Sequence, residues 1–365
     1  MTFTSNQKRV LGLVARTEGV MRSDICHILE ISPQTSMRIL QPLVEMGVVE
    51  EKESRAGTRG KPPMLVRFLK GSLASVGIAI SRDRIVVEVE DLGGGVHAKQ
   101  VLVKEIATAN EQLYWVKQLV QEATSTLPST CRIVGAVAVV QGFFVDRGKS
   151  IVSIADPIGW PQIDLKHELE ECVSAPVAIV NDGTALAGAL VSSTSTQHFL
   201  SLHVGSGTGG GIVCNGQLIE GAFGNAGEIG RLFDFSEVEV SEKSLLDALE
   251  QKDWRDWSGL SELTPEQNVS LEKWMGKAGE ILAQGASLAI AILDFDTLFL
   301  GSAMPFELTV MLSERINVKA LGEEVHGIDP MVIARQTPIV KPVYIHGLAS
   351  LANQLAAENF FTSAV

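Results

Sequence analysis

Two segments far apart in the chain restrict its fold more than any other feature. Residues 32–38, Ser-Pro-Gln-Thr-Ser-Met-Arg, have the capping serine and the early proline that begin a helix. Residues 204–211, Val-Gly-Ser-Gly-Thr-Gly-Gly-Gly, follow an apolar run and permit a tight turn. The first segment is typical of a DNA-recognition helix and the second of an α/β fold that binds a small molecule. We therefore expect DNA binding to be coupled to ligand binding.

The charge distribution separates these two activities along the chain. The formal net charge is -13, yet residues 1–70 hold 11 lysines and arginines against 7 aspartates and glutamates, out of 30 and 43 in the whole chain. The remainder is strongly acidic and repels nucleic acid, so DNA contact is expected only in the first seventy residues. No apolar run approaches the ~20 residues of a membrane span, and no apolar export segment opens the chain. A cytoplasmic location without a membrane partner is expected.

The cysteines and histidines indicate neither a disulfide framework nor a metal site. The four cysteines lie far apart with no Cys-x-x-Cys pair, and the isolated histidines lack ligand spacing. We interpret the cysteines as buried free thiols and the histidines as structural, and we expect no metal and no cofactor. These residues are Cys26, Cys131, Cys172 and Cys214, and His97, His167, His203 and His346.

The N-terminal head reads as helix, turn, helix. Helical spacing over residues 6–16 is followed by a short helix with Ser23 as its expected cap, and then by a third helix that Ser32 caps and Gly47 ends. One side of this third helix is apolar, and long polar side chains project from the opposite side. Gln34, Arg38 and Gln41 can pair with base edges in the major groove, and Thr35 suits phosphate. A solubilising helix face is an equally weighted alternative.

A basic hairpin follows the third helix. Residues 50–61 predict a β-hairpin wing, and residues 64–69 predict its returning strand, with a glycine- and proline-rich tip over residues 55–63. Arg55, Arg59 and Lys61 in this tip would meet the negative potential of a narrow minor groove. A basic linker is the alternative, but the preceding helices favour a winged helix-turn-helix domain over residues 1–70.

Beyond residue 70 strands alternate with helices, which indicates a layered α/β fold. Strands are predicted over 76–80, 85–90, 133–140, 200–204, 211–214 and 297–300, with helices over 112–125 and 281–292. We expect two similar lobes, residues 71–195 and 196–365, with a cleft between them and the final helix returning to the first lobe.

Five short motifs in one order resemble the ROK family, which comprises repressors, open reading frames and sugar kinases. The resemblance covers essentially the whole chain and implies an actin-like, hexokinase-type two-lobed fold that binds a sugar between its lobes. The motifs are the Asp91-Leu-Gly turn, Gly159-Trp160, Val180-Asn181-Asp182-Gly183, Val204 to Gly209, and Asn225-Ala-Gly-Glu228-Ile-Gly230.

The resemblance also implies the effector contacts. Asp156, Asn181, Asp182 and Glu228 match positions that bind sugar hydroxyls, and Asp182 matches the catalytic base of the kinases. Arg231 stands where the family has histidine. Its charge suits either an acidic or phosphorylated sugar or a surface salt bridge, and we weight the two alternatives evenly.

Departures from the family pattern argue against catalysis. Ala79 stands where similar kinases have the carboxylate that organises magnesium, and Ser302 replaces the second glycine of a pair placed over adenine. The cysteines that bind zinc in many relatives are missing between Leu232 and Leu260. We expect no catalytic residue and no zinc.

The sequence therefore predicts a sugar-responsive transcriptional regulator, with repression relieved by ligand as the favoured polarity. Its partners would be operator DNA and a sugar or sugar derivative, and it would form a homodimer or homotetramer because two-fold operators pair with two-fold proteins. The alternatives are an active ATP-dependent sugar kinase with a DNA-binding head, and a regulator whose kinase-like body binds another protein.

Overall fold

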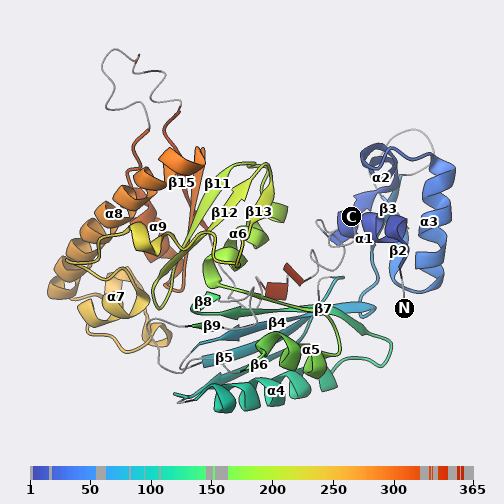
Figure 1. Cartoon of the computed structure of the whole chain (residues 1–365), viewed down its shortest axis with the longest axis horizontal. Helices are drawn as coiled ribbons and strands as arrows, with labels where there is room; N and C mark the ends of the chain where they lie inside the picture. Colours follow the sequence, from blue (N-terminus) through green and yellow to red (C-terminus); the bar gives the residue numbers. More distant parts are fainter. Residues whose placement is uncertain are drawn as a thin grey trace. The chain divides into compact units, whose positions relative to one another are not determined.

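The computed structural model describes residues 3–15, 19–54, 63–81, 84–93, 95–106, 108–144, 151–152, 163–320, 329, 331, 336–343, 352–353 and 355–356. The chain divides into two compact units, Met1–Val180 with Leu348–Val365, and Asn181–Gly347 (Figure 1). Sequence patterning places this boundary after residue 195. In the structure the boundary lies earlier, after Val180, because helix α6 (Asp182–Ser193) packs on strands β11 (Phe199–Val204) and β12 (Thr208–Cys214) of the second unit.

The head at the start of the first unit combines helices with a small antiparallel sheet. The helices are α1 (Ser5–Ala15), α2 (Arg22–Ile28) and α3 (Pro33–Glu45), and the sheet has the order β1 (Val20–Met21), β3 (Met64–Phe68), β2 (Val49–Glu53). As predicted, Ser32 caps α3, accepting a 3.1 Å hydrogen bond from the Thr35 N–H, and Gly47 follows the helix with a φ of 66°. The predicted cap at Ser23 is wrong, because α2 begins at Arg22 and Ser23 lies in its first turn.

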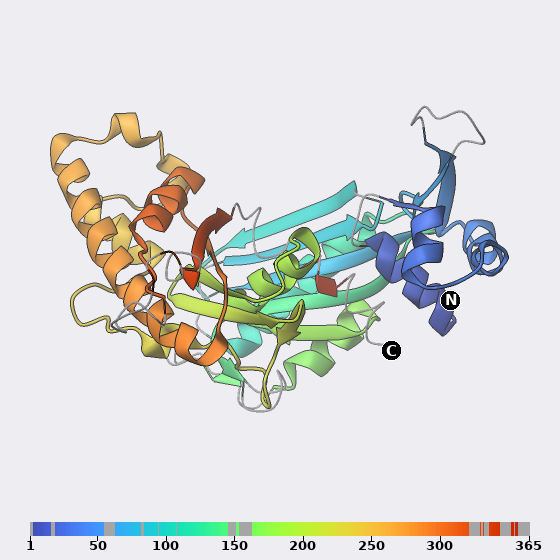
Figure 2. The ribbon, with the colours of Figure 1, turned by 90° about the horizontal axis from the view of Figure 1, so that it is seen from above.

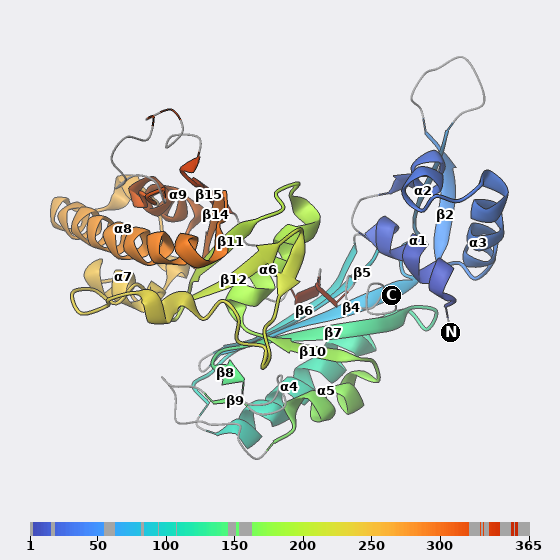
Figure 3. The same cartoon turned by 45° about the horizontal axis from the view of Figure 1, so that its top comes forward.

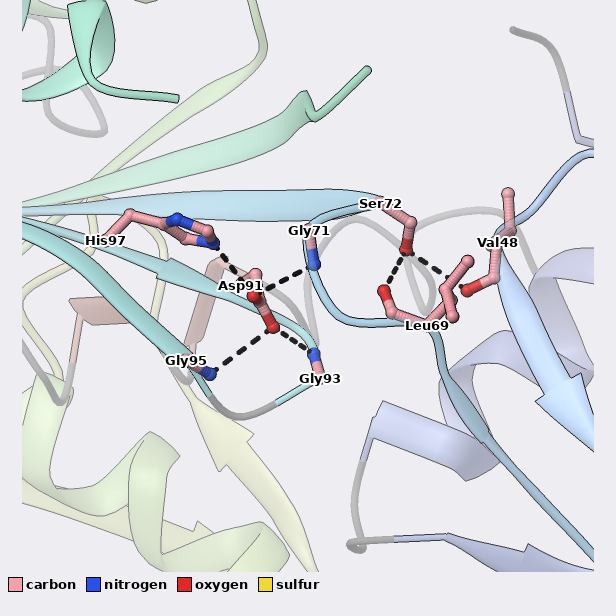
Figure 4. Close-up of polar contacts among 8 residues, drawn as sticks. All are labelled: Val48, Leu69, Gly71, Ser72, Asp91, Gly93, Gly95 and His97. Atoms are coloured by element: carbon pink, nitrogen blue, oxygen red, sulfur yellow. Dashed lines mark hydrogen bonds and ion pairs between the residues drawn. The ribbon is translucent and has the colours of Figure 1, made fainter. Parts of the chain in front are cut away.

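The head joins the rest of the first unit through a short, tightly bonded turn (Figure 4). Ser72 Oγ donates to the Leu69 carbonyl at 2.6 Å and to the Val48 carbonyl at 3.2 Å. The buried Asp91 carboxylate accepts from the Gly71 N–H at 3.0 Å. Leu73 belongs to the same apolar core as the helices of the head. The head is therefore packed onto the first unit and not tethered to it by a loose linker.

Asp91 also organises the turn in which it lies. Its Oδ1 accepts from the N–H groups of Gly93 at 2.7 Å and Gly95 at 3.3 Å, and its Oδ2 lies 2.8 Å from His97 Nε2 (Figure 4). The side chain of Asp91 is only 3% exposed. One carboxylate thus ties the turn that follows Asp91 to the turn that carries the head.

The large sheet of the first unit, as far as the chain is described, has the strand order β10-β7-β4-β5-β6. Strands β4, β5 and β6 form an antiparallel meander, and β7 and β10 extend it in parallel. Helices α4 and α5 pack against one face (Figure 3). The elements are β4 (Leu73–Ile80), β5 (Arg84–Asp91), β6 (Gly95–Val103), α4 (Ala109–Ser125), β7 (Arg132–Val140), β8 (Phe143–Phe144), β9 (Ile151–Val152), α5 (Leu165–Val173) and β10 (Val177–Val180).

The described part of the second unit repeats this topology, with the order β15-β14-β11-β12-β13. Its first three strands are again an antiparallel meander, and its last two are added in parallel. The strands are β11 (Phe199–Val204), β12 (Thr208–Cys214), β13 (Gln217–Ile219), β14 (Thr297–Ser302) and β15 (Ile339–Val343). This repetition matches the two similar lobes that the sequence predicts.

The helices of the second unit cover both faces of its sheet. The long α8 lies alongside α9 over one face (Figure 1, Figure 2), and α6 packs against β11 and β12. The predicted helix over 281–292 is only the end of α8. The remaining elements are η1 (Ile229–Leu232), α7 (Glu242–Ala248), η2 (Trp254–Asp256), η3 (Leu260–Glu262), α8 (Pro265–Leu293) and α9 (Phe306–Arg315).

The two faces of strand β11 differ, because one face carries apolar side chains and the other carries the polar Ser201 and His203. Leu200, Leu202 and Val204 belong to the core formed with α8 and α9. The intervening Ser201 and His203 are buried on the opposite face, because successive side chains of a strand alternate. Ser201 Oγ donates toward the Gly183 carbonyl at 3.3 Å, which places α6 over this polar face.

The end of the chain belongs to the first unit. Asn353 donates its side-chain amide to the Glu88 carbonyl at 3.0 Å, and its own carbonyl accepts from Ser75 Oγ at 3.2 Å. The described residues near position 353 thus lie against β4 and β5. No helix within the described ranges is long and apolar enough to span a membrane.

Replacing Asp91 by asparagine should lower the free energy of unfolding by about 3 kcal/mol, because the amide offers one acceptor oxygen where buried N–H groups and His97 need two. Urea unfolding of the full chain at neutral pH measures the loss. Asp247→Asn at an exposed site is the matched control, with an expected change within about 0.5 kcal/mol. Equal losses in the two variants would contradict a structural role for the Asp91 contacts.

Candidate functional site

The N-terminus of α6 is the centre of a polar cluster. Asn181, the N-cap, is 3% exposed and uses both ends of its amide. Its Oδ1 accepts from the Thr184 N–H at 2.7 Å, and its Nδ2 donates to Glu228 Oε1 at 2.7 Å. The same side chain therefore begins the helix and fixes the carboxylate of a distant loop.

Asp182, the first residue of α6, has a hydrogen-bonding partner at each carboxylate oxygen. Its Oδ1 accepts from the Gly183 N–H at 2.8 Å, and its Oδ2 lies 3.1 Å from His203 Nδ1. The side chains of Asp182 and His203 are 14% and 3% exposed. The sequence interpretation of His203 as a structural residue therefore missed a direct contact with the candidate site.

The glycine run positions this cluster by allowing close backbone contact. A Cβ on Gly183 would lie 2.4 Å from the backbone of Gly210 in β12, so no side chain fits between α6 and the strand. Residues 209–211 pair with residues 201–203 of β11 in the antiparallel ladder. The tight turn that the sequence permits at this glycine run agrees with this packing.

The pKa values of the two carboxyl groups in the cluster are shifted in opposite directions from their ordinary values. Burial acts to raise the pKa of Asp182, but the charge and hydrogen bond of His203 and the Gly183 N–H outweigh it and lower the pKa. Burial raises the pKa of Glu228, and the charge of Asp182 adds to this rise against the Asn181 hydrogen bond and the charge of Arg231. Opposed shifts in neighbouring carboxyl groups are typical of binding and catalytic sites.

Arg231 lies in η1 and is exposed. Its backbone N–H donates to the Glu228 carbonyl at 3.4 Å, and its positive charge acts to lower the pKa of the Glu228 carboxyl. The structure thus brings together four of the five residues proposed for effector binding. The fifth, Asp156, lies outside the described residues.

Two positions that depart from the kinase pattern have structural roles of their own. Ala79 lies within β4, paired with Val86 and Val139 on neighbouring strands. Ser302 ends β14, where its Oγ lies 2.6 Å from Thr309 Oγ1 and accepts from the Met304 N–H. The serine hydroxyl therefore stabilises the connection to α9.

Two further predictions concern metals and thiols. Within the described ranges, no three His, Cys, Asp or Glu side chains gather as a metal site would require. All four cysteines are free and half-buried, so they are less deeply buried than predicted.

In the head, the polar side chains of α3 face solvent. Gln34, Arg38 and Gln41 are exposed, whereas Thr35 is half-buried and hydrogen-bonded to Ser32. Gln41 donates to Glu45 at 2.9 Å, so its amide is already engaged beside a negative charge. The first half of α3 is therefore better suited to an anionic partner than the second half. Arg55, Arg59 and Lys61 lie outside the described residues.

The signal that could have identified His203 is the alternation of β11. A histidine and a serine occupy the odd positions of an otherwise apolar strand, and buried polar groups require partners. The sequence does not reveal which partner His203 has, since Asp182 lies on another element.

Comparisons with known proteins agree with this architecture. Residues 75–325 match the model of the ROK family. A xylose repressor from Bacillus subtilis strain 168 is 25% identical over 265 residues, which cover 68% of this chain and 68% of that protein.

Solved structures share the fold at low sequence identity. The crystal structure of a ROK family transcriptional regulator, described as a homolog of the E. coli MLC protein, matches 99% of this chain and 98% of its own with a TM-score of 0.67 and 15% identity. A ROK family glucokinase from Streptomyces griseus, solved with glucose and AMPPNP, matches 77% of this chain and 98% of its own, with a TM-score of 0.51 and 17% identity. Regulators and kinases therefore share this fold, and of these two structures the regulator matches nearly the whole of this chain.

Glu228→Gln should stabilise the protein at neutral pH, because it removes a buried charge and keeps an oxygen for Asn181. A raised folded-state pKa contributes stability below the ordinary value of 4.5 and loses it as pH rises, so the gain over wild type should appear above pH 4.5 and grow with pH. Urea unfolding between pH 4 and 8 measures it.

Asp182→Asn provides the opposite case. A lowered folded-state pKa contributes stability above the ordinary value of 3.8 and loses it at lower pH, so this variant should be less stable than wild type at neutral pH. A gain in stability for Asp182→Asn, or a loss for Glu228→Gln that grows with pH, would contradict the assigned electrostatics.

Proposed function

This chain belongs to the ROK family, and from that premise we propose that it is a sugar-responsive transcriptional repressor without phosphotransfer activity. The single observation that carries the effector assignment is the cluster formed by the buried Asn181 with the half-buried Asp182 and Glu228. The xylose repressor and the ROK regulator among the similar proteins support the same function.

The DNA-binding part of the proposal rests on the head. The order α2, turn, α3, followed by the β2–β3 hairpin, is that of a winged helix-turn-helix domain, with α3 as the recognition helix. Gln34, Thr35 and Arg38 are in the first half of α3, where recognition helices contact base edges. Gln41 in the second half of α3, and Arg55, Arg59 and Lys61 in the connection between β2 and β3, would complete the contact with both grooves.

The effector-binding part of the proposal rests on hydrogen-bond acceptors and donors of different kinds that lie close together. Asp182 offers a carboxylate held by protein donors, and Glu228 and Asn181 offer a hydrogen-bonded pair. Vicinal hydroxyls of a sugar both donate and accept, so they suit such a set. Arg231 at the exposed side, and Asp156, would add specificity for the substituents of the sugar.

Coupling of the two activities requires differential affinity. A ligand changes DNA binding only if it binds one arrangement of the protein more tightly than the other. Asn181 and Asp182 immediately follow Val180, where the chain passes from the first unit to the second. We propose that ligand contacts at these residues bias the relation of the two units, and hence the spacing of the heads in a homodimer or homotetramer.

A sugar kinase with a DNA-binding head is the second candidate, because Asp182 is retained and a ROK glucokinase shares the fold. Against it stand Ala79, Ser302 and the engagement of both oxygens of Asp182. ADP formation from ATP and Mg²⁺ with a panel of aldoses tests the alternative. Turnover that depends on both sugar and Asp182 would establish a kinase.

Arg38→Ala should weaken binding to a fragment of the protein's own promoter region by about tenfold to a hundredfold, since a bidentate base contact contributes about 1–3 kcal/mol. Fluorescence anisotropy at fixed salt measures the affinity. Arg9→Ala, which removes the same charge from an exposed position on α1, is the matched control. Equal losses in both variants would exclude a specific contact by Arg38.

Ligand binding should raise the unfolding temperature and release the DNA fragment. The screen contains D-xylose, other aldoses, sugar phosphates and sugar acids. For the active compound, Asp182→Asn should weaken binding about tenfold to a hundredfold, because a charge-assisted hydrogen bond is lost, and should leave DNA affinity without ligand unchanged. The exposed Asp247→Asn serves as control. An unaltered ligand titration in Asp182→Asn would reject the effector site.

A further inference from the structure

His203 is the one buried histidine in contact with the proposed effector site, within the part of the chain that is described. It comes from the middle of the second sheet, on the polar face of β11, and its Nδ1 lies 3.1 Å from Asp182 Oδ2. The other oxygen of the same carboxylate accepts from the Gly183 N–H at 2.8 Å. The two contacts fix the plane of the carboxylate from two different elements.

The glycine turn between β11 and β12 makes room for this pair. A Cβ on Gly205 would lie 2.7 Å from His203 Cε1, closer than side-chain carbons approach one another. A Cβ on Gly207, two residues later in the same turn, would contact nothing within 4 Å. The need for glycine at position 205 therefore comes from the imidazole and not from the turn as a whole.

We propose that His203 is a positioning residue that holds Asp182 as a fixed anionic acceptor for the effector and keeps it from acting as a general base. The inference rests on the proposed effector site. In this proposal His203, on the second sheet, is the residue that makes Asp182 bind the effector without taking part in phosphotransfer.

The electrostatic surroundings support this role. Burial alone would raise the pKa of Asp182, yet the charge and hydrogen bond of His203 lower it. Of the other charged groups, Asp182 acts to raise the pKa of Glu228, and Arg231 acts to lower the pKa of Glu228. Among these groups His203 is the partner that favours the ionised form of Asp182.

The consequence for chemistry follows from the lone pairs of the carboxylate. An ionised carboxylate has about four acceptor positions, so two protein donors leave room for hydroxyl groups of a ligand. A general base must instead take up a proton, and its efficiency falls as its pKa moves below the working pH. Orientation by His203 thus favours binding of a hydroxyl over its deprotonation.

The test uses His203→Gln in the full chain, with His198→Gln, a half-buried histidine immediately before β11, as the matched control. The ¹³C resonance of the Asp182 carboxyl, identified by its loss in Asp182→Asn, is followed against pH. In His203→Gln its titration midpoint should move to higher pH, and D-xylose should bind about tenfold more weakly by calorimetry. His198→Gln should change neither quantity. An unchanged midpoint in folded His203→Gln would overturn the proposal.

A second pair of variants covers the case in which His203→Gln does not fold. Gly205→Ala displaces the imidazole, and Gly207→Ala adds the same methyl group where there is space. Only Gly205→Ala should raise the Asp182 midpoint, and equal behaviour of the two variants would contradict the role of His203. The carboxyl titration needs no ligand. Failure of D-xylose and the rest of the panel to bind wild type would count against the proposed function, while the midpoints would still decide the role of His203.

Discussion

The Asn181 side chain links the local structure of α6 to the geometry of the site. It caps the helix through its carbonyl oxygen and holds Glu228 through its amide nitrogen, so neither contact can change without the other. It is also the first residue of the second unit. One buried amide therefore fixes both the start of α6 and the carboxylate of Glu228. Any ligand that competes for Glu228 acts directly on the N-terminus of α6.

The head is as firmly attached to the first unit as α6 is to the second. Asp91 accepts from the turn that carries the head, and Leu73 and Val134 of the large sheet share the apolar core of the head. If a flexible linker joined the head to the rest of the chain, the head would rotate freely. A conformational change caused by sugar binding would then not be transmitted to the head. A head packed on the first unit moves with that unit, so we propose that a ligand-dependent movement of the first unit carries α3 with it.

The sequence predicted elements whose signals are local and missed contacts that join distant segments. The Ser32 cap, the Gly47 stop and the hairpin strands follow from neighbouring residues, and the structure has them. The start of α8 was missed although Thr264 and Gln267 form a capping box, because its apolar stripe is diluted by polar residues over the first turns. The pairing of His203 with Asp182 joins two elements and has no local signal beyond a polar residue in an apolar strand.

Repressors and kinases share this fold, and we propose that the environment of one carboxylate, that of Asp182, separates the two functions. Both activities need a sugar held by directed hydrogen bonds, and a carboxylate serves in either case. Phosphotransfer further requires that this group accept a proton beside magnesium and phosphate. Here His203 and Gly183 each contact one oxygen of Asp182, and Ala79 stands where the resemblance implies the magnesium-organising carboxylate of the kinases. In the proposed repressor no chemical step consumes the bound state, so the energy of sugar binding goes into the change of conformation.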